Sequence, residues 1–509
     1  MEVKQSSQKK MGGMLLKAKR TGVLEKEVDS MDAMAAAAAA ADAPTLPAMD
    51  DAAATAAAVA PTIPAPTLPT PPSTFIITSP SSRSACVLTN LGATMMSFFA
   101  PATIAGADVP FVAATECGRG SNYVDICLGY DSAAEWASDV PYFGPVVGRV
   151  CNRIKEGKLI LPNGFSSQLA INNGPNHLHG GIVGWSKRLW TASDVGPHSV
   201  TFTLTSGDGD EGFPGEVLAS ATYTMLDGGD DSCATSSTLR LTMEASLSPE
   251  SPDGTLSPVN MTNHAYFNLC GGGVGGGGGG GVGSSSMSAP CGVLDHSIQM
   301  FADSYLPVDA NMIPTRVVAP LDGSPEMDFR SPRTLRSAVE SLALKAGGSK
   351  LSIDAMLDKR AGGKGLDGND EPIGIDHTYV LSGRGASSSS SSSSSSAPST
   401  SPAVLVPAAT LRHEESGRRL SLLTNAPGVQ CYTGNWLSVK GGKGGRTYGQ
   451  WDGVCFETQH FPDAIDRLEN AEFGKGATVL LGRGGGREFG GAAIDKYEHI
   501  VEYVFSNDK

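Results

Sequence analysis

The sequence lacks the features of a disulfide-stabilised or membrane-spanning protein. Its nine cysteines are odd in number, are spread along the chain and include no Cys-x-x-Cys pair. This pattern suits free thiols in a reducing compartment better than a disulfide framework. No apolar run approaches the ~18 residues that a membrane helix needs. The alanine run at residues 35–41 is short and lies between Asp32 and Asp42. We therefore expect no membrane partner.

The chain also has few basic residues. Lysine and arginine number 38 against 52 aspartate and glutamate, which gives a net charge of -14. The cations are scattered beyond the N-terminal region, so a nucleic-acid backbone is not the expected partner. With 40% hydrophobic residues, the 509-residue chain is long enough for one large all-β domain or two to three ordinary domains.

Residues 1–73 are predicted to be a separate tail. They are rich in alanine, proline and threonine, and such a composition cannot bury enough apolar surface to offset its ordering entropy. A disordered tail and an organellar targeting segment are both compatible with it. We expect a cytoplasmic protein, or an organellar one if residues 1–73 act as a transit segment.

Three low-complexity segments interrupt the rest of the chain. Residues 271–288 are mostly glycine and serine, residues 345–370 are rich in Gly, Lys and Asp, and residues 383–402 contain a serine run. All three are predicted to be flexible surface loops between strands. The glycine run is not a phosphate-binding loop, because it lacks the Gly-Lys-Ser/Thr ending.

Between these segments the pattern is that of an all-β protein. Residues 201–205 and 239–243 alternate apolar and polar side chains at period two, as half-buried antiparallel strands do. Residues 75–78, 219–226 and 500–505 are further strand candidates. Helical periodicity is scarce, with residues 334–344 as one short candidate. The sequence predicts a large antiparallel β-sandwich.

One stretch, residues 259–269, combines strand-forming apolar residues with polar ones. We expect it to form a strand carrying His264 together with Asn260, Asn263 and Asn268. Buried polar groups are costly unless each finds a partner. A concave site for a polyhydroxylated ligand would supply partners, and so would the protein backbone.

Residues 455–464 repeat this pattern with a carboxylate, Glu457, in an apolar run. His264 and Glu457 are therefore candidates for an acid and a base that meet in the fold. Between these two stretches, Asp376 opens a predicted strand and can accept hydrogen bonds from hydroxyls or simply begin a turn. Gln430 can both donate and accept.

Two further clusters lie earlier in the chain. Asn152 and Arg153 lie in the cluster at residues 148–154, and the planar Arg153 guanidinium can grip vicinal oxygens or lie at the surface. If residues 172–181 are extended, His177 and His179 lie on one face. With His264 and Glu457 they offer an alternative zinc site.

In their order along the chain, these clusters resemble the aldose 1-epimerases, the galactose mutarotase family. The resemblance covers residues 74–507 apart from the loop insertions. The matching stretches are residues 128–131, 148–154, 172–181, 211–215, 262–269, 303–309, 313–315, 376–381, 427–435 and 456–464.

The resemblance implies a single-domain β-supersandwich over residues 74–507, with no metal or organic cofactor. His264 would be the general acid and Glu457 the general base. Six further positions would bind the substrate: Asn152, Arg153, His179, Tyr266, Asp376 and Gln430.

The implied reaction is the interconversion of α and β anomers of free hexoses such as glucose and galactose. The partner would be a small aldohexose, and the protein would be a monomer or weak dimer. A non-catalytic sugar-binding module and a hexose-6-phosphate 1-epimerase are the alternatives. A glycoside hydrolase would need two carboxylates flanking the bond. The reaction requires His264 to be protonated, so we expect a nearby negative charge to hold its proton.

Overall fold

The computed structural model describes residues 68–81, 83–101, 123–228, 236–271, 292–347, 372–382, 404–465, 478–483 and 493–508. All of them belong to one compact unit, Ala60–Lys509. The first strand, β1, begins at Thr74. Residues 1–67 of the predicted tail lie outside the described residues, as do most of the predicted loops at residues 271–288, 345–370 and 383–402.

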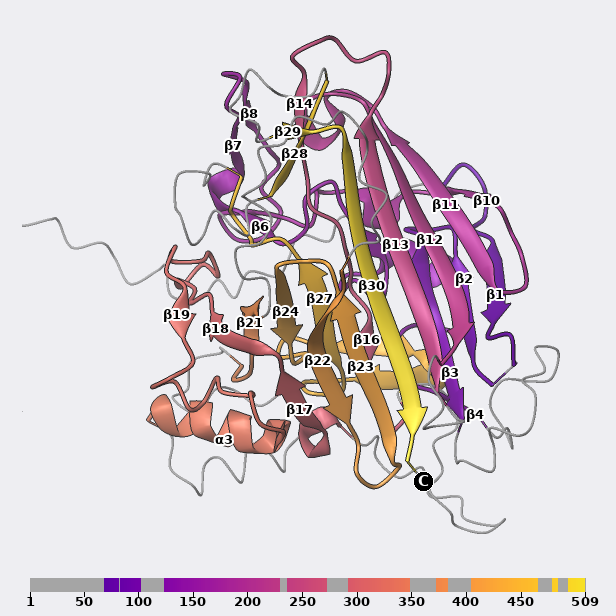
Figure 1. Cartoon of the computed structure of the whole chain (residues 1–509), viewed down its shortest axis with the longest axis vertical. Helices are drawn as coiled ribbons and strands as arrows, with labels where there is room; N and C mark the ends of the chain where they lie inside the picture. Colours follow the sequence, from indigo (N-terminus) through magenta and orange to yellow (C-terminus); the bar gives the residue numbers. More distant parts are fainter. Residues whose placement is uncertain are drawn as a thin grey trace, which may run out of the picture. The chain divides into compact units, whose positions relative to one another are not determined.

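The largest element is a nine-stranded antiparallel sheet, in which the long strands β13 and β30 run side by side (Figure 1). The predicted period-two segments, residues 201–205 and 239–243, lie in it, and they alternate buried and more exposed side chains. In spatial order its strands are β10 (Thr191–Ser193), β11 (Ser199–Ser206), β12 (Val217–Asp227), β13 (Ser237–Leu247), β30 (Lys496–Asn507), β23 (Arg418–Thr424), β22 (Val406–Arg412), β17 (Ser297–Met300) and β20 (Arg333–Thr334).

A six-stranded antiparallel sheet is the second main layer. Its strands β24 and β27 are buried on both faces almost throughout, unlike the half-exposed strands of the nine-stranded sheet. In spatial order its strands are β16 (Tyr266–Phe267), β27 (Val454–Gln459), β24 (Gly428–Tyr432), β21 (Asp376–Leu381), β18 (Ala302–Tyr305) and β19 (Ala319–Pro320).

Smaller sheets and short helices complete the described part of the chain. The short sheets are β1 (Thr74–Thr78) with β2 (Ala85–Thr89), β3 (Thr94–Pro101) and β4 (Tyr123–Asp125); β14 (Leu256–Val259) with β28 (Val479–Gly482) and β29 (Ala493–Ile494); β15 (Thr262–Asn263) with β5 (Val146–Val147); β6 (Arg153–Ile154) with β9 (His177–Leu178); β7 (Lys158–Ile160) with β8 (Ser166–Gln168); and β25 (Val439–Gly442) with β26 (Arg446–Tyr448). The 3₁₀ turns are η2 (Ala133–Ser138), η3 (Lys155–Gly157), η4 (Trp185–Lys187), η5 (Asp210–Gly212), η6 (Val293–Asp295) and η7 (Lys443–Gly445).

The predicted short helix is confirmed as α3 (Leu335–Lys345). Its start is fixed by Thr334, whose hydroxyl accepts a hydrogen bond from the Ser337 N–H at 3.3 Å. One face of α3, with Leu335 and Val339, is buried. The all-β prediction therefore holds, since the described residues are mostly strand.

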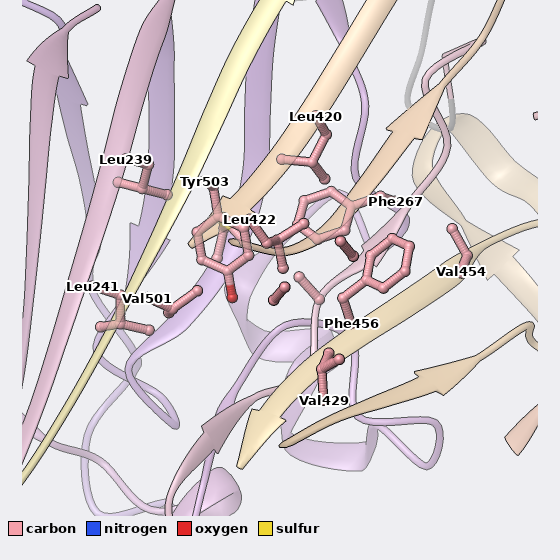
Figure 2. Close-up of a cluster of buried hydrophobic side chains, with 14 of the residues drawn as sticks. Leu239, Leu241, Phe267, Leu420, Leu422, Val429, Val454, Phe456, Val501 and Tyr503 are labelled. Atoms are coloured by element: carbon pink, nitrogen blue, oxygen red, sulfur yellow. The ribbon is translucent and has the colours of Figure 1, made fainter. Parts of the chain in front are cut away.

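The core lies where the two main sheets face each other. Figure 2 shows Tyr503 and Leu422 from the nine-stranded sheet packed near Phe267 and Phe456 from the six-stranded sheet. The Phe267 and Tyr503 rings lie 5.6 Å apart. Alternation along a strand sends every second side chain to the opposite face. The residues that flank Phe456 on β27 therefore point away from this core.

The prediction of one continuous strand over residues 259–269 is wrong. The stretch forms the end of β14, then β15 and β16, which pair with β28, β5 and β27 respectively. The chain thus changes partner twice in a few residues. Asn260, Asn263 and Asn268 make these changes possible, because their side chains donate hydrogen bonds to backbone carbonyls where the strand pairing is interrupted.

The described cysteines confirm the expectation of free thiols: Cys86, Cys127, Cys151, Cys270, Cys431 and Cys455 form no disulfide. Within the described ranges, no helix has the length and apolarity of a membrane span.

Candidate active site

The floor of the candidate site is the face of the six-stranded sheet that points away from the core. Glu457 on β27 is directly opposite Gln430 on β24. Gln430 in turn is opposite Thr378 on β21, two residues from Asp376. Directly paired residues, and residues two apart on one strand, point to the same side of a sheet. Glu457, Gln430 and Asp376 therefore lie on the same face. This arrangement depends on strand pairings between distant parts of the sequence.

His264 reaches this floor from the link between β15 and β16. Its backbone N–H donates to Pro145 O at 3.1 Å, and its carbonyl accepts from the Gly144 N–H at 3.0 Å. These bonds hold the imidazole with its Nε2 3.6 Å from Glu457 Oε1. The Tyr266 ring stacks nearly parallel to the imidazole, with centroids 5.3 Å apart. The structure thus brings the predicted acid and base together.

The asparagines around His264 bond to the backbone instead of facing the site. Asn260 donates to His460 O at 3.1 Å, Asn263 to Gly144 O at 2.8 Å and Asn268 to Asp452 O at 2.9 Å. In contrast, His264 Nδ1 and Glu457 Oε2 are buried and have no hydrogen-bond partner among the described residues. Unpaired buried polar atoms are costly, so these two atoms mark the place where a ligand is expected.

The two predicted histidines separate in space. The expectation that they share a face is wrong, because His179 has a left-handed φ of 53° instead of an extended one. The His179 ring lies 5.2 Å from the His264 ring. His177 instead bonds through Nδ1 to Ala170 O at 2.9 Å and packs against Phe213. Only His179 therefore belongs to the site.

Asn152 determines the tautomer of His179. The Asn152 N–H donates to His179 Nδ1 at 3.2 Å, and the Asn152 carbonyl accepts from the His179 N–H at 3.0 Å. Since Nδ1 is the acceptor, the proton of the neutral ring is on Nε2, which is then a hydrogen-bond donor. The Asn152 side chain itself accepts from the Arg153 N–H at 2.8 Å. Asn152 thus contributes through its backbone.

The rim of the site carries the half-buried charges. Arg153 donates through Nε to Asn173 at 3.0 Å, which leaves the rest of its guanidinium to other partners. Asp376 accepts from Gln430 Nε2 at 2.6 Å, and Gln430 Oε1 accepts from the Thr378 hydroxyl at 2.5 Å. This relay fixes the orientation of the Gln430 amide and leaves one Asp376 oxygen free of the relay.

Two aromatic side chains complete the wall. The Tyr266 hydroxyl donates to Pro141 O at 2.9 Å, so the ring of Tyr266 faces the site instead of its hydroxyl. Tyr142 was not predicted from the sequence. Its ring lies 4.7 Å from that of His179 and 5.9 Å from that of His264. A single tyrosine before Phe143 and Gly144 gave no pattern from which its position could be inferred.

Burial determines the charges in the site. It lowers the pKa of His264 to about 4, and it lowers the pKa of His179 well below its usual range, with the neighbouring His264 and Arg153 adding to the effect. Burial raises the pKa of Glu457 well above its usual range; Asp376 adds to this rise and Arg153 opposes it. The separation of 3.6 Å exceeds hydrogen-bond length, so burial outweighs the attraction between the pair. Burial therefore opposes the expected protonation of His264.

The zinc hypothesis retains three of its four residues. His179, His264 and Glu457 place one ligand atom each within 4.8 Å of one another, and two imidazoles with a carboxylate are a donor set that zinc accepts. His177 lies outside the cluster. The same three groups, with unpaired atoms on His264 and Glu457, equally suit proton transfer to and from a bound molecule.

Comparisons with known proteins agree with this geometry. A sequence model described as aldose 1-epimerase matches residues 112–475. The galactose mutarotases of Sus scrofa and Homo sapiens are each 34% identical over 390 residues, covering 76% of this chain and 85% of theirs. The aldose 1-epimerase of Escherichia coli is 28% identical over 342 residues, 67% of this chain and 78% of its own.

The fold is similar to that of a solved aldose epimerase homologue from C. elegans. The two structures align with a TM-score of 0.59 at 23% identity, and the alignment covers 86% of this chain and 100% of that one. A galactose 1-epimerase structure from Lactobacillus acidophilus gives 0.53 at 22% identity, with 86% of this chain and 99% of that one covered. From its sequence relatives and its fold, this chain belongs to the aldose 1-epimerase family of carbohydrate isomerases.

Proposed function

We propose that this protein interconverts the α and β anomers of free aldohexoses such as glucose and galactose, with Glu457 and His264 as the proton-transfer pair. The observation that carries this proposal is their meeting at 3.6 Å, each with an unpaired buried atom. A hemiacetal has both of its oxygens on one carbon, so the acid and the base that exchange protons with these oxygens must also be neighbours. The galactose mutarotase relatives support the free sugar as substrate.

The reaction breaks the bond between C1 and the ring oxygen. Glu457, as carboxylate, takes the proton of the C1 hydroxyl, while His264, as imidazolium, donates a proton to the ring oxygen. The product is the open aldehyde, with Glu457 protonated and His264 neutral. Rotation about the C1–C2 bond presents the other face of the aldehyde. The reverse proton transfers then close the ring as the other anomer. Each transfer contributes about 100- to 10,000-fold.

The pair needs only one proton throughout this cycle. Burial favours the neutral form of both partners, because it lowers the pKa of His264 to about 4 and raises the pKa of Glu457 well above its usual range. This is the distribution that the ring-opened complex requires. For the closed sugar the proton must lie on His264, and the sugar hydroxyls that solvate the carboxylate favour this state together with Arg153, which lowers the pKa of Glu457.

The remaining groups hold the sugar while C1 turns. His179 Nε2 and the Arg153 guanidinium are donors, and Asp376 is an acceptor whose orientation Gln430 fixes. Anchored hydroxyls keep C2 to C6 in place, so that rotation is confined to C1. The faces of Tyr266 and Tyr142 supply the apolar surface that a pyranose ring packs against.

Polarimetry on freshly dissolved α-glucose and α-galactose tests the proposal. The protein should accelerate the approach to the anomeric equilibrium of both sugars. A non-catalytic sugar-binding module would leave the spontaneous rate unchanged. Turnover of the 6-phosphates, measured in parallel, should be lower; a clear preference for them would instead assign the hexose-6-phosphate epimerase activity.

A chelator separates proton transfer from the zinc alternative. Dialysis against EDTA should leave the polarimetric rate within twofold of the untreated protein, because the pair acts without a metal. A loss of activity that added zinc restores would show that His179, His264 and Glu457 act as ligands.

A further inference from the structure

The segment around Glu211 matches the family pattern but has no role in the proton transfers described above. Its carboxylate accepts hydrogen bonds from three consecutive backbone N–H groups: Oε2 from Ile182 at 3.0 Å, and Oε1 from Val183 at 3.0 Å and Gly184 at 3.5 Å. Three donors converging on one carboxylate make a charge-assisted clamp. The clamped segment begins three residues after His179.

The backbone between His179 and this clamp has an unusual conformation. His179, Gly180 and Gly181 all have left-handed φ angles, of 53°, 82° and 115°. A side chain at Gly180 would lie 1.9 Å from Gly148 O, and one at Gly181 would lie 2.1 Å from Glu211 Oε2. A non-glycine residue in this region of φ is strained. Contacts on both sides must therefore hold His179 in place.

One of these contacts is already known from the site. Asn152 holds the N–H and the Nδ1 of His179. On the other side, the Asn172 amide donates to Leu178 O at 3.0 Å and to Gly181 O at 2.9 Å. Glu211 supplies the third contact, beyond the glycines, and is the only charged one of the three.

Glu211 is itself firmly placed. The Arg149 guanidinium, whose residue is 1% exposed, donates to Pro214 O and Gly215 O, both at 2.9 Å, and to Ser206 O at 3.1 Å. The same guanidinium lies 5.7 Å from the centre of the Phe213 ring. The turn that carries Glu211 is thus tied to the core at both ends, so its carboxylate can position a neighbouring loop.

We propose that Glu211 is a positioning residue that sets the orientation of His179 toward the sugar through the backbone of residues 182–184. This inference rests on the proposed function. The hydrogen bonds of Glu211 go to the backbone of residues 182–184 and not to His264 or Glu457. Its effect passes through the backbone to the imidazole, so the loss of Glu211 matters only while His179 is present.

The Glu211→Gln variant tests this role. A carboxamide must turn its NH2 toward a backbone N–H, which sets two donors against each other. We expect kcat/KM for galactose to fall about tenfold, the usual cost of one charge-assisted bond. Glu211→Asp keeps the charge but is one methylene shorter, and should lose a similar amount. Glu216→Gln is the matched control: it removes the same charge nearby and should stay within twofold.

A double-mutant cycle with His179→Asn gives a result that a merely structural role would not. In the His179→Asn background, Glu211→Gln should have no further effect on kcat/KM. Equal losses in both backgrounds would overturn the proposal, and so would unchanged activity of both Glu211 variants.

The imidazole can also be observed without turnover. In spectra of ¹⁵N-histidine-labelled protein, Glu211→Gln should shift the His179 ring signals, assigned with His179→Asn, while Glu216→Gln leaves them in place. An unchanged His179 signal in Glu211→Gln would refute the positioning role. If the wild-type protein proves inactive in polarimetry, the proposed function fails, but this measurement still decides the role of Glu211.

Discussion

The strands β30 and β27 are both interior strands of their sheets, yet they differ in what they bury. Side chains of β30 alternate between buried and more exposed positions, whereas all six residues of β27 are buried. One face of β30 packs on the core and the other meets solvent. β27 has the same core face, but its second face forms the floor of the site with Glu457.

The comparison shows how the fold makes room for chemistry. A buried second face would be expected to be apolar, but β27 carries Glu457 and Gln459 there, beside the apolar Cys455. The carboxyl group gains nothing in stability from this position, because an oxygen atom is left unpaired. This face of β27 contributes Glu457 to the proposed site, whereas the opposite face packs in the core. Substitutions on the site face of β27 should therefore lower activity without lowering stability, and substitutions on the core face should lower stability.

The largest effect is expected from the site face. Glu457→Gln keeps the shape of the side chain but cannot exchange a proton, so kcat should fall about 1,000-fold or more. His264→Asn should cost nearly as much. Polarimetry gives the rate, and titration calorimetry with galactose should show that binding by Glu457→Gln is retained. The unfolding midpoint should not fall, because glutamine keeps the shape of a side chain whose buried carboxyl group has an unpaired oxygen. A variant with more than a tenth of wild-type kcat would refute the assignment.

The neighbouring residue on the core face should show the reverse. Phe456→Ala leaves a cavity opposite Phe267 and should destabilise the protein by about 3–5 kcal/mol. Urea unfolding followed by tryptophan fluorescence measures this loss. Phe456→Leu, the milder control, should lose less. If Phe456→Ala were as stable as the wild type, the division between the two faces of β27 would be wrong.

Acid should expose the cost of burying His264. Its pKa in the folded protein is about 4, below the ordinary 6.5. Between these values the unfolded chain takes up a proton at this histidine that the folded chain does not, so the contribution of His264 to stability falls as the pH falls below 6.5 and is constant above it.

The expected loss by pH 4.5 is about 2–3 kcal/mol. His264→Asn should lack this component, so its stability relative to the wild type should rise between pH 7.5 and 4.5 in urea titrations. If the free energy of unfolding changed with pH in the same way in both proteins, the lowered pKa of His264 would be contradicted.

The smallest contrast is between the two histidines of one motif. His179→Asn removes a donor to the sugar and should lower kcat/KM about 10- to 100-fold, within the range of a lost hydrogen bond to a polar substrate. His177→Asn removes a bond to Ala170 O outside the site and should lower it less than threefold. Greater sensitivity at His177 would reverse the assignment.

The sequence was sufficient to predict the parts of the fold that follow from local alternation. β12, β13 and β30 are long and lie between turn-forming residues, and their period of two is visible without the partner strands. The stretch at residues 259–269 was not predictable in the same way. Its composition favours a strand, but its pairing with three different strands depends on sequence up to about two hundred residues away.

For the site, the motifs identified His264 and Glu457, but not their state. Protonation depends on burial, and burial belongs to the packed chain. Tyr142 was missed because its contact with His179 comes from tertiary packing alone. Likewise, the separation of His177 from His179 depends on one left-handed residue that Gly180 and Gly181 accommodate.

The sequence by itself determined the β-rich architecture and supplied an acid, a base and the donors that grip a sugar, because periodicity and residue chemistry are local properties. The tertiary structure alone decided which of these groups meet, which asparagines bond to the backbone instead, and in which direction burial shifts the pKa of each partner. The physical reason is that strand pairing across hundreds of residues sets the distances, and burial then sets the charges.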